Sequence, residues 1–172
     1  KALALRASAI GVKVNYFDIE RQVEAEKKLG LKYVLPDELL CNSDIVSYHV
    51  PKTNYTHQII NQNSLKQMRR DAILINTSRG HIHDEEALYK ALSSGEIFGA
   101  GLDVFEIEPL QKNSPLRKLK NVLLTPHSAP DRESYIKSIR NALTNIIRVS
   151  EGSPPLSIAK DYNKITKKFL KD

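Results

Sequence analysis

Short apolar runs alternate with longer, helix-like stretches along most of this chain. Five of the runs are mostly apolar on both faces, which is typical of parallel strands covered by helices on both sides. They span residues 12–17, 45–49, 72–76, 100–104 and 122–125. This repeated alternation of strand and helix predicts an α/β fold with a right-handed, doubly wound parallel sheet.

Two helices are expected near the start of the chain. Residues 1–10 are apolar on almost all sides, so we expect the first helix to be buried. Gly11 follows it in the position that commonly ends a helix. Residues 22–29 predict a second helix, which ends at Gly30.

Two further helices are expected to begin at aspartates, whose side chains cap helix N-termini. Asp84 precedes a helix that ends at Gly95, and Asp131 precedes a long helix that ends near Gly152. Two prolines just beyond Gly152 forbid its continuation. The apolar stripes are Ala87, Leu88, Ala91 and Leu92 on the first of these helices, and Tyr135, Ile136, Ile139, Leu143, Ile146 and Ile147 on the second.

Composition indicates a folded, globular protein. The 172 residues, 41% hydrophobic and 27% charged, suit about one globular domain. The single Cys41 excludes an internal disulfide and suits a reducing compartment, so we expect a cytoplasmic location. No apolar run is long enough to span a membrane, so no membrane-spanning segment is expected.

The net charge of +6 raises the question of a polyanionic partner. The basic residues are spread along the chain, and only residues 160–171 are locally rich in lysine. This distribution favours a solvated basic surface over a nucleic-acid site. His81 and His83 lie close together, but no third ligand with suitable spacing accompanies them, so no metal site is predicted.

Polar residues follow the predicted strands at their carboxyl ends, where doubly wound sheets bind ligands. They are Asp18, His49, the segment 77–79, Asp103 and His127. An acidic residue such as Asp18 holds the adenosine ribose in dinucleotide-binding folds, about 20 residues after a glycine-rich turn. Counting back from Asp18 passes the start of the chain, so we expect residue 1 not to be the native N-terminus. The first strand and its glycine turn would then precede it.

Two of these positions carry candidate catalytic chemistry. Arg79, followed by the turn-forming Gly80, presents a guanidinium that suits a carboxylate. His127 follows the last strand and is a candidate general acid, with Glu108 as the carboxylate that would orient it. Asp103 ends a buried strand and is expected either to be structural or to face a ligand. Taken singly, each of these residues has a common structural explanation as well.

The three blocks 76–80, 99–109 and 125–127, in this order and spacing, resemble the D-isomer-specific 2-hydroxyacid dehydrogenases. The resemblance covers residues 1 to about 158. It implies a Rossmann-type NAD-binding domain at residues 1–129, with residues 130–172 forming a long helix and a tail that return toward a separate substrate domain. It also implies a homodimer formed through the first helix and the region 112–119.

The resemblance implies a role for each matching residue. Arg79 would bind the carboxylate and carbonyl of a small 2-oxo or 2-hydroxy acid, and His127, paired with Glu108, would donate a proton to the carbonyl oxygen. Asp18 would bind the ribose of NAD. The other positions that match cofactor contacts are His49, Val50, Pro51, Thr77, Ser78, Asp103, Ser128, Ala129 and Pro130, together with Arg79 and His127.

The sequence also departs from the family pattern. His83 occupies a position where a small aliphatic residue is usual, and residues 128–130 replace a stretch that commonly contains glycine. Two alternative functions stay open: a non-catalytic, NAD-sensing interaction module of the corepressor kind, and a structural remnant that binds no cofactor. The intact set of Arg79, Glu108 and His127 favours the enzyme.

Overall fold

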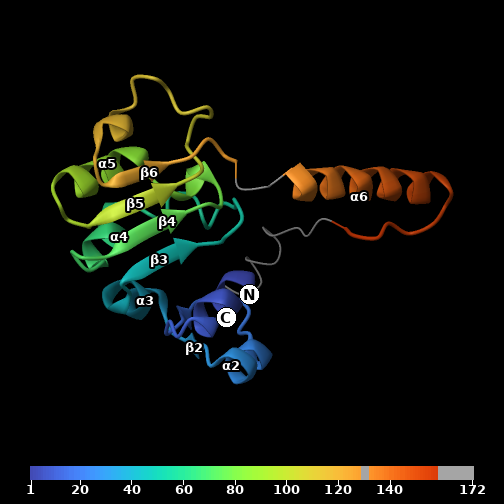
Figure 1. The fold of residues 1–172 in the computed structure, drawn as a ribbon, viewed down its shortest axis with the longest axis horizontal. Coiled ribbons are helices and arrows are strands. Elements are labelled where there is room, and N and C mark those ends of the chain that lie inside the picture. Colours follow the sequence, from blue (N-terminus) through green and yellow to red (C-terminus); the bar gives the residue numbers. More distant parts are fainter. Residues whose placement is uncertain (129–131, 159–172) are drawn as a thin grey trace.

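The structure, a computed structural model, describes residues 1–128 and 132–158. All of its named strands pair in parallel, in two sheets (Figure 1). The smaller sheet consists of β1 (Asn15–Tyr16) and β2 (Lys32–Tyr33). The larger sheet has the order β3 (Ile45–Tyr48), β4 (Ile73–Asn76), β5 (Gly99–Leu102) and β6 (Val122–Leu124). The predicted parallel α/β architecture is confirmed.

Helices lie between successive strands, as parallel pairing requires, while α1 (Ala2–Ala9) precedes the first strand and α6 (Arg132–Ser150) follows the last. The others are α2 (Val23–Leu29), α3 (Pro36–Asn42), α4 (Gln62–Gln67) and α5 (Glu85–Ser93), with two short 3₁₀ helices, η1 (Gly80–Ile82) and η2 (Pro115–Lys118). The smaller sheet with α1 and α2 forms the blue part of Figure 1, and the larger sheet with α4 and α5 the part that runs from teal through green and yellow to orange.

Several local predictions are confirmed. Asp84 caps α5, because its Oδ1 accepts from the backbone N–H of Ala87 at 2.9 Å. Gly11, Gly30 and Gly95 follow their helices with positive φ angles, the conformation in which glycine carries no Cβ penalty. Asp131, the predicted cap of α6, lies outside the described residues.

The prediction that the first helix is buried is wrong. No residue of α1 is buried, and Leu3 and Leu5 are each about half exposed. The reason is that the strands form two separate sheets, so the sheet next to α1 has only two strands. Among residues 1–128 and 132–158, β1 pairs only with β2, and β3 only with β4. A helix buries its apolar side against a continuous sheet face, and α1 has no such face.

Besides the two 3₁₀ helices, three elements were not anticipated, and each is short. β2 has two residues, α3 seven and α4 six, mostly polar. Segments of this length carry too little periodicity to be distinguished from loops. The sequence did hold one local signal for α4. Asn61 and Ser64 form a reciprocal capping box, in which the Asn61 side chain accepts from the Ser64 N–H and the Ser64 side chain from the Asn61 N–H.

The apolar core surrounds the larger sheet. Leu74 of β4, Leu102 of β5, Leu65 of α4 and Leu88 of α5 are all buried and belong to one apolar cluster. This core fixes the carboxyl ends of β4, β5 and β6 at one edge of the sheet, because parallel strands in register end together. Candidate site residues follow these ends.

Helix α6, like α1 and α2, has no buried residue. It lies to one side of the sheets in Figure 1, and its stripe, including Ile139, Leu143 and Ile146, is exposed. The assignment of residues 130–172 as a separate helix and tail stays a prediction. No helix among the described residues is long and apolar enough to cross a membrane.

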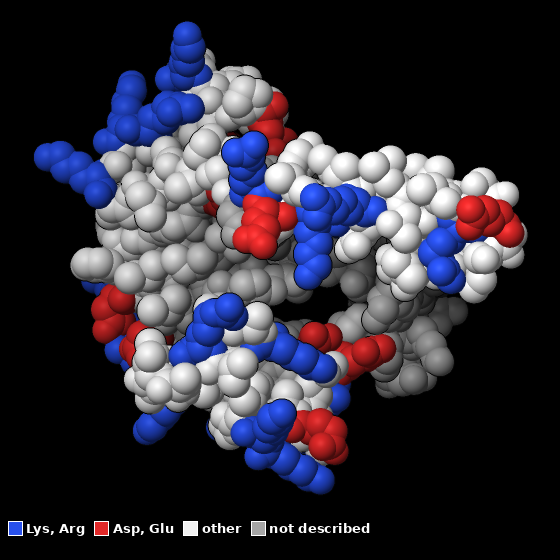
Figure 2. Space-filling view, turned by 45° about the vertical axis from the view of Figure 1, so that its right-hand side comes forward, with Lys and Arg blue, Asp and Glu red and all other residues white. Residues whose placement is uncertain are grey.

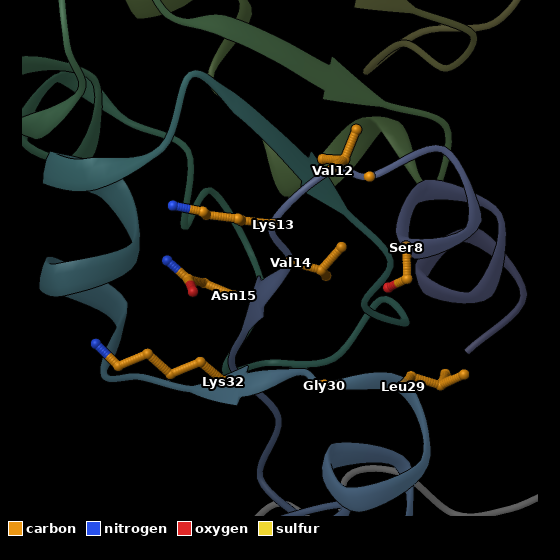
Figure 3. A pocket seen from close by; sticks show the side chains of 9 residues that line it. Ser8, Val12, Lys13, Val14, Asn15, Leu29, Gly30 and Lys32 are labelled. Carbon is orange, nitrogen blue, oxygen red and sulfur yellow. The ribbon is translucent and has the colours of Figure 1, made fainter.

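The charged side chains are distributed over the surface. Figure 2 shows lysine and arginine side chains scattered over the visible face, with acidic side chains between them. Figure 3 shows a hollow next to the smaller sheet, lined by Ser8 of α1, the segment 11–15 and Lys32 of β2, among others. None of the predicted site residues lines this hollow.

Candidate active site

The predicted catalytic pair is formed in the structure. The Nδ1 atom of His127 lies 2.7 Å from Oε2 of Glu108, so a protonated Nδ1 donates to the carboxylate. The backbone N–H of Phe105 donates to the other oxygen, Oε1, at 3.1 Å. Both side chains are partly exposed, at 42% for His127 and 37% for Glu108. They are therefore accessible to a ligand and already oriented toward each other.

The surroundings of Glu108 favour its ionised form. Its pKa lies below the ordinary value, chiefly because of the hydrogen bond to His127 and despite some desolvation. The bond from Phe105 and the positive charge of Arg79 act in the same direction as the histidine. A carboxylate at this position stabilises positive charge on the imidazole, because the attraction between two charges is mutual.

His127 lies in a constrained stretch of backbone. Its φ angle is +52°, in the left-handed region that non-glycine residues seldom adopt. Asp103 holds the residues on either side, since its Oδ1 accepts from the Thr125 hydroxyl at 2.6 Å and from the Ser128 N–H at 2.9 Å. Unfavourable backbone geometry that the surroundings enforce is common at functional sites. The buried Asp103 thus joins the end of β5 to the loop that carries the histidine.

Arg79 follows β4 and is exposed. Asn76, the last residue of β4, holds the loop before it: its Oδ1 accepts from the N–H and the hydroxyl of Ser78, and its Nδ2 donates to the Arg79 carbonyl. Gly80 fixes the other side of the arginine. A Cβ atom on Gly80 would lie 1.7 Å from the carbonyl oxygen of Phe105, so only glycine permits this close approach.

His83 lies directly behind this loop, with its side chain fully buried. Burial lowers its pKa to about 4, while the charges of Glu106 and Asp84 act in the opposite direction and that of His81 in the same direction. Its ring is therefore neutral near neutral pH. Neither Asn76 nor His83 was among the predicted site residues; the unusual identity of residue 83 was the only signal in the sequence.

The predicted cofactor positions lie at the carboxyl ends of several strands. Asp18 follows β1 and is exposed; its Oδ1 accepts from the Glu20 N–H at 3.1 Å. His49 follows β3, with its Nε2 atom 2.9 Å from the Ser47 hydroxyl, and partial burial lowers its pKa. Thr77 is exposed at the end of β4.

Of the four remaining predicted cofactor contacts, the structure describes two. Val50 and Pro51 continue the chain after β3, and the Pro51 carbonyl accepts from the Thr56 hydroxyl at 2.6 Å. Ala129 and Pro130 lie outside the described residues.

This donor and acceptor set suits a dinucleotide. The exposed Asp18 carboxylate after β1 can accept from ribose hydroxyls, and β3 and β4, which pair in parallel, end at one edge of the larger sheet with exposed polar groups. Asp18 would hold the adenosine ribose, and the loops after β3, β4 and β6 would border the nicotinamide end.

The parallel α/β fold and these residues are typical of a dinucleotide-binding domain, and comparison with known proteins establishes its family. Residues 1–129 match the family model of the D-isomer specific 2-hydroxyacid dehydrogenase, NAD binding domain. The chain belongs to this family, and the prediction of NAD as its cofactor is confirmed.

Among individual proteins, the chain is 44% identical over 166 residues to a glyoxylate reductase of Korarchaeum cryptofilum, covering 95% of this chain and 50% of that protein. In structure it is similar to the NAD-complexed D-isomer specific 2-hydroxyacid dehydrogenase of Lactobacillus delbrueckii ssp. bulgaricus. The TM-score is 0.80 at 36% identity, over 92% of this chain and 52% of the other. For the D-lactate dehydrogenase of Lactobacillus jensenii with NAD+, the TM-score is 0.82 at 31% identity, with the same coverage. The chain spans about half the length of these relatives.

Proposed function

We propose that this chain is the coenzyme-binding part of an enzyme that reduces a small 2-oxo acid with NADH, and that glyoxylate is its first candidate substrate. The observation that carries the proposal is the 2.7 Å contact between His127 Nδ1 and Glu108 Oε2. The positive charge of Arg79 also helps to lower the pKa of the Glu108 carboxyl. An acid, its orienting carboxylate and a carboxylate-binding cation are the groups that such a reduction requires. Glyoxylate is favoured because glyoxylate reductases are among the relatives more than 40% identical to this chain.

Each of these residues has one task in the proposed reaction. Arg79 binds the substrate carboxylate through its two-donor guanidinium and so orients the neighbouring carbonyl group. NADH, when bound, would supply the hydride for the carbonyl carbon. His127 gives its proton to the carbonyl oxygen, which completes the hydroxyl group of the product.

Glu108 and Asp103 would prepare the histidine for this step. With Nδ1 donating to Glu108, Nε2 is the nitrogen that can exchange a proton with substrate. The Glu108 carboxylate stabilises the imidazolium before transfer, and Asp103 holds the loop through Thr125 and Ser128.

The test is NADH oxidation by the complete enzyme with glyoxylate, followed by absorbance. His127→Ala is expected to lower kcat by about 10²–10⁴-fold, the usual contribution of a positioned acid. Arg79→Ala is expected to raise KM and lower kcat, and Arg79→Lys to recover only part, since an ammonium lacks the guanidinium fork. Arg70→Ala is the matched control, because exposed Arg70 lies before β4, at the opposite end of the strand.

The outcomes separate this proposal from its alternative. An NAD-sensing interaction module would bind NADH but turn over no 2-oxo acid. Unchanged turnover in His127→Ala, or equal effects of Arg79→Ala and Arg70→Ala, would contradict the assigned roles.

A further inference from the structure

His83 is an unusual side chain to find in an apolar core. It follows η1, its side chain is 0% exposed, and its Nδ1 atom lies 2.8 Å from Nδ2 of Asn76. Its Nε2 atom is buried and has no hydrogen-bond partner among the described residues; the nearest charged oxygen, Oε1 of Glu85, is 3.9 Å away. A buried polar atom without a partner costs stability. An aliphatic side chain would avoid this cost, so packing alone does not explain the histidine.

The hydrogen bonds around Asn76 fix the position of the proton on His83. A backbone N–H can only donate, so the Asn76 atom that faces the Ser78 N–H at 3.0 Å is the oxygen. The other amide atom is then the nitrogen, which agrees with its 3.1 Å contact to the Arg79 carbonyl. An amide nitrogen only donates, so Nδ1 of His83 accepts and the ring proton is on Nε2.

The Asn76 side chain thus connects His83 to the backbone N–H of Ser78 and to the backbone carbonyl of Arg79. Its oxygen holds Ser78 twice, through the N–H and the hydroxyl, and its nitrogen holds the Arg79 carbonyl. The second N–H of this amide is buried and points to His83. Without an acceptor there, the amide would keep one unpaired proton in the core and would gain by rotating away from Arg79.

We propose that His83 is a positioning residue for the substrate-binding arginine: its Nδ1 accepts from the Asn76 amide and thereby fixes the loop from which Arg79 extends. This inference rests on the proposed function, because it takes Arg79 to bind the substrate carboxylate. His83 contacts neither substrate nor cofactor. Its influence is on how well Arg79 captures the carboxylate.

The test is the affinity of the complete enzyme with NADH for oxamate, an unreactive analogue of small 2-oxo acids. His83→Leu removes the acceptor at similar volume and is expected to weaken oxamate binding about tenfold, the cost of one unpaired buried donor. His83→Asn places an oxygen near the former Nδ1 and is expected to restore most of the affinity. Ile97→Ala is the control, because buried Ile97 precedes β5, at the far end of the sheet; it should lower the melting temperature without changing oxamate affinity.

The results separate this inference from the proposed function. If Arg79→Ala leaves oxamate affinity unchanged, the proposed function fails, and this inference with it. If Arg79→Ala weakens binding while His83→Leu does not, only this inference fails. It also fails if His83→Asn is as weak as His83→Leu, or if Ile97→Ala loses as much affinity as either.

A second measurement needs no substitution. The ¹⁵N chemical shifts of the histidines in the unmodified enzyme report which ring nitrogen carries the proton. For His83 we expect a protonated Nε2 and an unprotonated Nδ1 near neutral pH. A proton on Nδ1 would overturn the inference even if none of the variants folds.

Discussion

Gly80 provides a direct test of how the loop of Arg79 and the loop of Glu108 are held together. A Cβ atom at this position would lie 1.7 Å from the Phe105 carbonyl oxygen, 2.0 Å from its carbonyl carbon and 2.7 Å from the Glu106 nitrogen. All three are backbone atoms, so no side chain can rotate out of the way. Since Cβ contacts below 3.0 Å essentially never occur, Gly80→Ala has to separate the loops by roughly 1.3 Å.

The expected cost is near the upper end of the range for overpacked sites, about 3 kcal/mol. For a protein of this size that corresponds to a melting temperature lower by about 6–12 °C. Glu108 is close in sequence to Phe105 and Arg79 adjoins Gly80, so the same displacement separates the two groups and should lower turnover of the complete enzyme.

The matched control is Gly95→Ala. Gly95 has a φ angle of +71°, and a Cβ atom at this position would meet no other atom within 4 Å, so alanine there has backbone strain but no clash. That strain is worth about 1 kcal/mol, or about 2–4 °C. Thermal unfolding followed by circular dichroism compares the two variants. Equal melting temperatures would refute the argument that close approach, and not glycine's flexibility, requires Gly80.

Four further outcomes are expected. In Glu108→Gln, kcat for 2-oxo acid reduction should fall, because a neutral amide no longer attracts the positive charge that His127 carries before proton transfer; an unchanged kcat would remove Glu108 from the mechanism. The pKa of His83 is lowered from 6.5 to about 4, so the unfolded chain binds a proton that the folded chain does not. The free energy of unfolding should therefore fall by up to about 3 kcal/mol as pH drops through this window; urea titrations at several pH values should show a shallower fall in His83→Asn, and equal slopes would count against it. The carboxylate of Asp18 repels a 2′-phosphate, so kcat/KM should be higher with NADH than with NADPH, and comparable values would contradict that role. The exposed apolar side chains of α1 suit self-association, so sedimentation should show a dimer at micromolar concentration; a monomer would count against the predicted interface.

The larger sheet and the contact between His127 and Glu108 could be anticipated from sequence because their signals are local. The runs that became β3 to β6 are apolar on both faces, and Asp84 with Gly95 encloses α5 through the preferences of its own termini. His127 and Glu108 were paired through motif and spacing, and the 2.7 Å contact places them together. Parallel strands bring their carboxyl ends to one edge, so residues far apart in the chain meet there without any further information.

Tertiary structure decided what depends on partners distant in the chain. From sequence, helix α1 is predicted to be buried, because its own residues are mostly apolar. Its actual burial depends on whether a continuous sheet lies beneath it. From sequence, Gly80 is predicted to be a turn residue. The structure shows that glycine is required because the backbone of Phe105, 25 positions later, leaves no room for a Cβ atom. His83 reads as a departure from the family pattern. Its bond to Asn76 is visible only once η1 folds back on the end of β4, because a buried hydrogen bond belongs to two segments and is encoded in neither alone.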